Sequence, residues 1–357
     1  MKLIDRYIIQ KFLSTFLFVM LILVAIIVVI DYTEHNDKFV KNDVSGEEIL
    51  GYYFSFIPFI ANLITPITVF IATVFVTSKM AGHTEIIAIL SSGVSFKRMM
   101  LPFLVGATII SLVTLYMNGW VIPDANKTRI NFQINYFRQP KFFSERDIHM
   151  KVAPTSYAYM ESYNNRTNSG FRFTLETIEN GEVKEKLSAL RIKWDSTDAN
   201  WKLEKWKYVK IMADHEETET GERMDTTINI HPRDFSNISG LHETLTNAEL
   251  NDYIAQLKLR GDDGIAIYLI EKYVRFMTPF SAIILTFIGV IVSARKTRGG
   301  TGFQIALGFL LAFIYIIFFI MARAIAESSN INPIIGVWIP NIVFSILGAV
   351  MYKTVPR

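Results

Sequence analysis

Residues 12–30 read FLSTFLFVMLILVAIIVVI, an unbroken run without a charged side chain. A helix that crosses a bilayer needs about 20 predominantly apolar residues, because lipid offers no partner for backbone N–H and C=O groups. Five further charge-free runs follow, at 49–77, 99–122, 276–294, 301–322 and 334–352. Six such runs argue against the buried helices of a soluble protein. We therefore predict an α-helical integral membrane protein with six transmembrane helices.

Basic residues gather on one side of these runs. The two connecting segments of that side, with the two ends of the chain, carry eleven Lys and Arg against two acids, Asp5 and Glu85. The short loops of the other side, 31–48 and 323–333, carry three basic residues against seven acids. Because cytoplasmic loops are enriched in Lys and Arg, we expect both termini in the cytoplasm. The long segment between spans three and four then lies outside.

The net charge of +3 gives no support to nucleic-acid binding. Residues 121–270 hold 20 basic and 23 acidic side chains, so the outer segment is slightly negative. The basic excess lies beside the cytoplasmic membrane surface, where anionic lipid accounts for it.

The outer segment has the pattern of β-strands. Apolar and polar residues alternate in FRFTL at 171–175 and in LRIKW at 190–194, a period of two that is typical of half-buried strands. Turn-forming clusters separate such stretches at 179–181, 195–198 and 219–221. The apolar parity changes between Leu203 and Trp206, which predicts a bulge. We expect an inserted all-β, sandwich or jellyroll-like domain over 123–270, between helical regions at 1–122 and 271–357.

A helix is predicted at the end of this domain. Thr246 and Glu249 have the spacing of a capping box, in which each side chain meets the other's backbone N–H. Leu250, Ile254 and Leu257 then form one apolar face.

The cytoplasmic loop at 79–98 contains a second short helix, predicted over about 83–92. His83 or Thr84 can cap its start, and Gly93 can end it in the left-handed conformation. Glu85 near the start either complements the helix dipole or docks a cytoplasmic partner. The pattern alone leaves both interpretations open.

No motif for catalysis is visible in the sequence. The nearest glycine cluster to a phosphate loop, at 299–302, lacks the lysine that the loop requires. The six histidines have no metal-ligand spacing, and there is no cysteine and no Gly-x-Ser-x-Gly elbow. We expect no cofactor, no metal site and no enzymatic activity. Uphill transport by this protein would need energy from another chain.

The chain resembles the lipopolysaccharide-export permeases of the LptF/LptG (YjgP/YjgQ) type over nearly its whole length. The resemblance is carried by LIDRYI at 3–8, TEIIAILSSG at 84–93, WVIP at 120–123 and the block 295–302 followed by two spans. The IDRYI start and WKL at 201–203 are more similar to LptG than to LptF.

The resemblance implies an assembly in the bacterial inner membrane. Such permeases form an LptF–LptG heterodimer on a cytoplasmic ATPase dimer, LptB. They take lipopolysaccharide from the outer leaflet and pass it to a periplasmic β-jellyroll bridge of LptC and LptA type. The family's loop helix docks the ATPase through a glutamate, which corresponds here to Glu85. The implied coupling set is Thr84, Glu85, Ile86, Leu90 and Gly93.

Two further sets of candidate residues concern the lipid. Family members often place a lysine near the outer end of span one, whereas this chain has Asp31 there. The replacements that we expect to contact lipid phosphates are Lys38, Lys41, Lys127, Arg129 and Arg323. Alternatively, these cations only balance neighbouring acids such as Asp124 or Glu327. For an acyl-chain trough in the β-domain the candidates are Phe171, Phe173, Leu175, Ile192, Trp194 and Trp206.

Two other functions remain open from the sequence. A membrane-anchored receptor or scaffold would use the β-domain to bind a ligand and would need no ATPase. A permease for another lipidated cargo would keep the ATPase and respond to different lipids.

Overall fold

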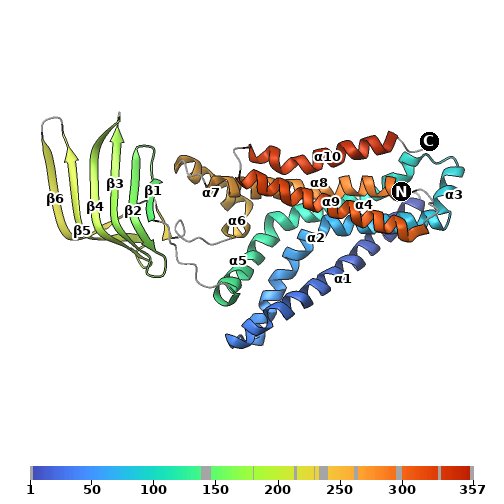
Figure 1. The fold of residues 1–357 in the computed structure, drawn as a ribbon, viewed down its shortest axis with the longest axis horizontal. Helices are drawn as coiled ribbons and strands as arrows, with labels where there is room; N and C mark the ends of the chain where they lie inside the picture. Colours follow the sequence, from blue (N-terminus) through green and yellow to red (C-terminus); the bar gives the residue numbers. More distant parts are fainter. Residues whose placement is uncertain are drawn as a thin grey trace. The chain divides into compact units, whose positions relative to one another are not determined.

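The computed structural model describes residues 3–137, 146–179, 181–212, 215–228, 230–232, 240–260, 264–294, 300–328 and 331–353. The chain divides into two compact units (Figure 1). The helical unit comprises Met1–Phe137, His242–Leu250 and Ala266–Arg357. The sheet unit comprises Arg138–Leu241 and Asn251–Ile265.

Six helices of the described chain are long and apolar enough to cross a membrane, which confirms the six predicted spans. The third span continues as one rod from α4 through a π-helical turn and α5 to a second π-helical turn. The predicted boundary at residue 122 therefore lies inside this rod, and the boundary at residue 270 lies inside α8. The helices are α1 Leu3–Lys41, α2 Gly46–Gly82, α4 Phe96–Tyr116, η1 Met117–Val121, α5 Ile122–Phe132, η2 Gln133–Phe137, α8 Ile265–Ser293, α9 Gly300–Ser328 and α10 Pro333–Lys353.

The part of the helical unit around the start of α1 is held together by large apolar side chains. Ile8 and Phe12 of α1 are fully buried in one cluster with Met80 of α2 and with Met99 and Phe103 of α4. Burial of such side chains is the main source of packing contacts between helices. Span one is otherwise the least buried of the six candidate spans.

Side-chain caps define where several helices begin. Ser45 and Glu48 form a capping box at the start of α2, and the Ser95 hydroxyl accepts the Arg98 N–H at the start of α4. The predicted box of Thr246 and Glu249 is also present, with Glu249 Oε2 2.8 Å from the Thr246 backbone nitrogen. It opens α7, Asn247–Arg260, which follows the short α6, Leu241–Thr244. The predicted apolar face of α7 is buried at Leu250, Ile254 and Leu257.

The described strands form one six-stranded antiparallel sheet in the order of the chain. This confirms an inserted all-β domain. The described strands form a meander, in which each pairs with the strand immediately before it through a short turn and none crosses to a second sheet. A jellyroll needs strands that cross between two sheets. The strands are β1 Arg146–Lys151, β2 Ser156–Asn164, β3 Ser169–Glu179, β4 Glu182–Asp195, β5 Asn200–Ile211 and β6 Glu216–Thr226.

A row of left-handed residues crosses this sheet. Asp147, Arg172 and Lys205 have φ of 56°, 49° and 51°, and the pairing registers place them at one level on β1, β3 and β5. The inward-facing set changes parity across this row, so Leu203 and Trp206 both pack on the sheet's core. The predicted change of parity is confirmed. The strand register shows no bulge there, because neighbouring strands change parity at the same level.

Candidate functional site

The short helix that was predicted over about 83–92 is α3, Glu85–Ser91. Gly93 follows it with φ of 85°, the left-handed conformation that was expected to end the helix. The expected side-chain cap is wrong. Thr84 has φ of 60°, whereas a capping residue needs extended backbone, and its hydroxyl donates to the carbonyl of His83 at 2.6 Å.

The faces of α3 differ in burial. Ile86 is 3% exposed and packs into the cluster that contains Ile8 and Phe12 of α1. Ile87 and Leu90 are exposed. The helix therefore has one apolar anchor on the inside and free apolar side chains on the outside, together with one carboxylate at its first position.

That carboxylate, Glu85, is held by the N-terminal end of α1. The Tyr7 hydroxyl donates to Oε2 at 3.1 Å, and Lys11 Nζ lies 3.4 Å from Oε1. Lys11 also donates to the Tyr7 hydroxyl at 2.6 Å. His83 Nδ1 lies 3.7 Å from Oε1. We did not predict this contact from the sequence, although Tyr7 and Lys11 have the i, i+4 spacing that places them on one helix face.

A second contact joins α1 to the other end of the loop. The guanidinium of Arg98, in the first turn of α4, donates to both oxygens of Asp5 at 2.6 and 2.7 Å. Asp5 is 7% exposed. Two-point ion pairs of this kind are the strong ones, because they fix geometry as well as charge.

The five expected phosphate-contacting residues do not share one environment. Lys38 and Lys41 lie in the exposed last turn of α1, where Lys38 donates to the carbonyl of Phe137 at 3.3 Å. Lys127 pairs with Asp124 at 2.9 Å, and Arg323 pairs with Glu327 at 3.0 Å. The last two contacts are those of the alternative interpretation, in which the cations balance neighbouring acids.

The expectation for Arg129 is wrong in its geometry. Its side chain is 7% exposed and forms an ion pair with Glu243 of α6. It also donates to Asn126 at 2.9 Å, and its guanidinium lies 3.8 Å from the centre of the Phe59 ring. The charge is used inside the helical unit, to hold α6 against α5, and it does not lie on an exposed rim.

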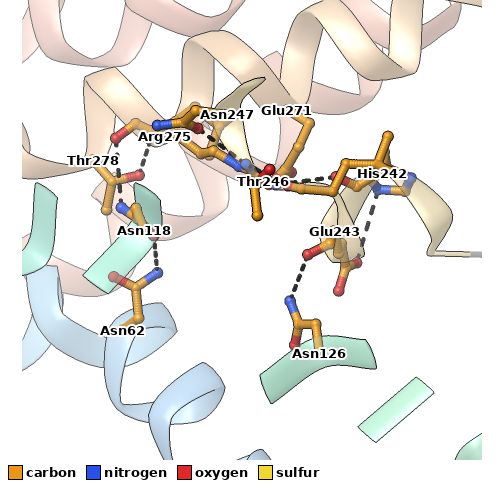
Figure 2. Close-up of polar contacts among 12 residues, drawn as sticks. Asn62, Asn118, Asn126, His242, Glu243, Thr246, Asn247, Glu271, Arg275 and Thr278 are labelled. Atoms are coloured by element: carbon orange, nitrogen blue, oxygen red, sulfur yellow. Dashed lines mark hydrogen bonds and ion pairs between the residues drawn. The ribbon is translucent and has the colours of Figure 1, made fainter. Parts of the chain in front are cut away.

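A buried polar cluster surrounds Arg275 of α8 (Figure 2). The guanidinium donates to Glu271 at 2.9 Å and to the carbonyls of Leu245 and His242 at 2.8 and 3.1 Å. It also donates to the Asn247 amide oxygen at 3.1 Å. Arg275 thus fixes the segment that connects the sheet unit to span four.

The same cluster reaches spans two and three. Asn118, in the first π-helical turn, donates to the carbonyl of Arg275 at 3.4 Å and accepts from Asn62 of α2 at 2.8 Å (Figure 2). We did not predict this site from the sequence. Two asparagines inside charge-free runs could have indicated it, since polar residues in spans are retained for specific contacts.

Two cavities adjoin Asn62. One of about 350 Å³ lies between α1, α2 and α4 and is lined almost entirely by apolar side chains. The other, of about 360 Å³, lies between α2, η1, α8 and α9 and has Glu271, Arg275 and Arg323 among its lining residues. Asn62 lines both, so the polar cluster lies beside each cavity.

The acyl-chain candidates divide between the two faces of the sheet. Phe173 and Ile192 are buried in its core, and Leu175, Trp194 and Trp206 are half-buried beside them. The expectation is wrong for Phe171, which is 41% exposed and lies near the Arg191 guanidinium. The left-handed backbone of Arg172 accounts for this, because it reverses the alternation between Phe171 and Phe173.

No group of His, Cys, Asp and Glu suited to a metal ion occurs among the described residues. Residues 295–299, at the start of the late block that carries the resemblance, lie outside the described residues.

Six apolar helices with a β-sheet domain inserted between the third and fourth define a multi-pass membrane protein. The model of the family described as lipopolysaccharide export system permease LptF/LptG matches residues 6–354, and the chain belongs to this family. It is 20% identical over 351 residues, 96% of each chain, to the lipopolysaccharide export system permease protein LptG of Escherichia coli strain K12. The protein of the same name in Escherichia coli O6:H1 gives the same values. The resemblance inferred from the sequence is confirmed.

Proposed function

We propose that this chain is the LptG-type subunit of a lipopolysaccharide export complex in the bacterial inner membrane. In this proposal it pairs with a homologous LptF-type subunit, with both termini in the cytoplasm and the β-domain in the periplasm. The asymmetry of Lys and Arg between the loops supports that orientation. Attachment of a small tag to either end and assay of its accessibility from outside would test it.

The energy for transport comes from a separate ATPase dimer of LptB type. The sequence contains no phosphate-binding loop, so the chain has no means of its own to bind the nucleotide. Export in this proposal is extraction of lipopolysaccharide from the outer leaflet. The lipid then passes along the β-domain to a periplasmic bridge of LptC and LptA type.

The observation that carries the proposal is the position of Glu85. It opens a short helix whose outer side chains, Ile87 and Leu90, are exposed, and its own side chain is 28% exposed. A carboxylate with four lone-pair positions can accept from an incoming cation while it keeps Tyr7 and Lys11. Hydrogen bonds to charged groups contribute about 1.5–3 kcal/mol each.

The test is replacement of Glu85 by alanine in the complete complex. We expect Glu85→Ala to lose most co-purification of the ATPase and to abolish export, with the permease still inserted and folded. Lys97→Gln is a matched control, because Lys97 is an exposed charge in the same loop. Normal ATPase recovery and export with Glu85→Ala would refute the proposed docking role.

Of the five cations, Lys38 and Lys41 are the residues that we propose for contact with lipid phosphates. They lie in the exposed last turn of α1, whereas Arg129 is buried and paired. The double variant Lys38→Gln/Lys41→Gln should retain less lipopolysaccharide after purification than the wild type. Equal lipid content in both would assign selection of the cargo to acyl-chain burial alone.

A further inference from the structure

The cytoplasmic loop 83–98 is fastened to α1 at both of its ends. At the start of the loop, Glu85 accepts from Tyr7 and lies 3.4 Å from Lys11. At its end, Arg98 forms the two-point ion pair with Asp5. Between these contacts, Ile86 packs in the cluster that holds Ile8 and Phe12. These contacts place α1, which is remote in sequence, against both ends of the loop.

The backbone on either side of α3 does not continue as helix into α2 or α4. Thr84 with φ of 60° precedes α3, and Gly93 with φ of 85° follows it. Both left-handed residues interrupt the helical hydrogen-bond ladder, so α3 does not continue rigidly into α2 or α4. A push on α3 is therefore transmitted through side chains as well as along the backbone.

The helices that could carry such a push differ in regularity. α1 is one uninterrupted helix from Leu3 to Lys41 and contains neither glycine nor proline. α2 contains Pro58 and Pro66. The third span contains Pro102 and passes through the π-helical turn Met117–Val121. Proline and π-helical turns are the usual places where helices kink, so α1 is the stiffest of the three routes.

We propose that α1 is the element that receives the displacement of α3 and carries it across the membrane, with Asp5 and Lys11 as the positioning residues that fasten it to the loop. A straight helix of 39 residues is about 58 Å long, so its outer end, with Lys38 and Lys41, moves with its cytoplasmic end. The inference rests on the proposed docking of an ATPase at α3. It goes beyond that docking, because it assigns the route by which docking is converted into transport.

A defect in docking would lower both ATP hydrolysis and lipopolysaccharide transport, whereas a defect in α1 should lower transport alone. If α1 is the receiver, loss of its fastening leaves the ATPase bound and hydrolysing but lowers the lipopolysaccharide moved for each ATP consumed. The experiment uses the complete complex in proteoliposomes, with phosphate release and lipopolysaccharide release measured on the same sample. The variants are Asp5→Asn, Asp5→Arg, Arg98→Asp, the exchange Asp5→Arg/Arg98→Asp, and Lys11→Met.

We expect ATPase co-purification and phosphate release within about twofold of the wild type for each single variant. Lipopolysaccharide released per ATP should fall at least fivefold. The exchange variant should recover most of the ratio, because it rebuilds the ion pair with the charges reversed. Lys97→Gln, which alters an exposed neighbour of Arg98, should leave the ratio unchanged. Thermal unfolding in detergent identifies variants that fail to fold. If Asp5→Arg fails to fold, the neutral Asp5→Asn still tests the loss of the ion pair.

Two results would overturn the inference. An unchanged ratio in folded Asp5→Asn and Lys11→Met complexes would show that α1 is not the receiver. Loss of ATPase co-purification in these variants would place Asp5 and Lys11 in the docking surface. Failure of the proposed function looks different, since the wild-type chain itself would then recover no ATPase or move no lipopolysaccharide.

Discussion

The ring of Phe12 on α1 lies directly against Gly106 on α4. A Cβ atom at Gly106 would be 2.6 Å from Cδ1 of that ring, closer than atoms that are not bonded can approach. Phe12 is fully buried, and its ring is 5.7 Å from that of Phe103, one turn earlier on α4. The absence of a side chain at Gly106 thus lets α1 approach α4 closely, near the loop 83–98 that is fastened to α1.

We expect Gly106→Ala to lower the stability of the protein. In an open helix position, alanine in place of glycine stabilises by about 1 kcal/mol, but overpacking of a tight site costs about 1–3 kcal/mol. The measurement is the midpoint of thermal unfolding in detergent. Gly51→Ala is the matched control, because nothing lies within 4 Å of a Cβ added there, and it should be neutral or stabilising. If Phe12→Leu in the Gly106→Ala background restores no stability, the steric explanation is wrong.

Arg129 and Lys127 are cations on the same helix, and we expect their replacement to affect the stability of the protein differently. Arg129→Met should destabilise the helical unit, because it leaves Glu243 without its guanidinium partner in a site that is largely removed from water. Breaking a buried pair costs about 3–5 kcal/mol, and the 27% exposure of the Glu243 side chain places this pair towards the lower end. Thermal unfolding in detergent and hydrogen exchange of residues 241–247 both report this loss.

Lys127→Met is the control for that experiment. Lys127 is exposed, and its pair with Asp124 joins residues on one helix, an arrangement that contributes about 0.2–0.5 kcal/mol. We expect almost no change in the unfolding temperature. If Lys127→Met destabilises the protein as much as Arg129→Met, the buried pair with Glu243 has no special role.

Part of this arrangement could be predicted from the sequence and part could not. The spans follow from apolar runs, and the box of Thr246 and Glu249 follows from a spacing of three, because both depend on residues that are close in the chain. Arg129 could not be placed in this way. Its partner Glu243 lies 114 positions away, and only the fold shows that the guanidinium is buried.

The errors in the sheet have a similar cause. Strict alternation placed Phe171 and Phe173 on one face, but Arg172 has left-handed backbone. An arginine gives no indication of this conformation in the sequence. The parity change at Leu203 and Trp206 was visible because both residues are apolar. The constant register around it depends on the neighbouring strands and is invisible in any single segment.

Asp195 in the sheet unit predicts a dependence of stability on pH. A hydrogen bond from Lys202, and then the backbone N–H of Thr197, lower the pKa of Asp195 from its ordinary value of 3.8 to about 2. A lowered folded-state pKa means that the ionised form stabilises the fold. This contribution is complete above about pH 5 and is lost as the pH falls from 4 towards 2.

The check is urea unfolding of the full chain in detergent, followed by tryptophan emission. Three of the five tryptophans, Trp194, Trp201 and Trp206, lie in the sheet. Asp195→Asn should be less stable than the wild type at pH 6, and the difference should shrink as the pH falls below 4. Asp198→Asn is the control, because Asp198 is more exposed and lies 4.0 Å from the same lysine. A constant difference at all pH values would exclude ionisation of Asp195 as its origin.

The two faces of the sheet predict where a lipid chain can be captured. Leu175 and Trp206 are half-buried at the edge of the core, so their positions adjoin both the apolar interior and its surroundings. Phe173 and Ile192 are 1% and 0% exposed, which leaves their side chains no contact with a passing molecule. A photo-crosslinking amino acid at Leu175 or Trp206 should therefore capture lipopolysaccharide when ATP is supplied to the complete complex.

Phe171 is the matched control, since it is an aromatic residue on β3, only four positions from Leu175, but lies on the opposite face and is 41% exposed. Greater exposure alone would favour capture at Phe171, whereas a path along the core face favours Leu175 and Trp206. Equal capture at all three positions would indicate unspecific contact with lipid. Crosslinks from Leu175 and Trp206 to protein alone would mean that the core is closed at this edge and that the acyl chains travel by another route.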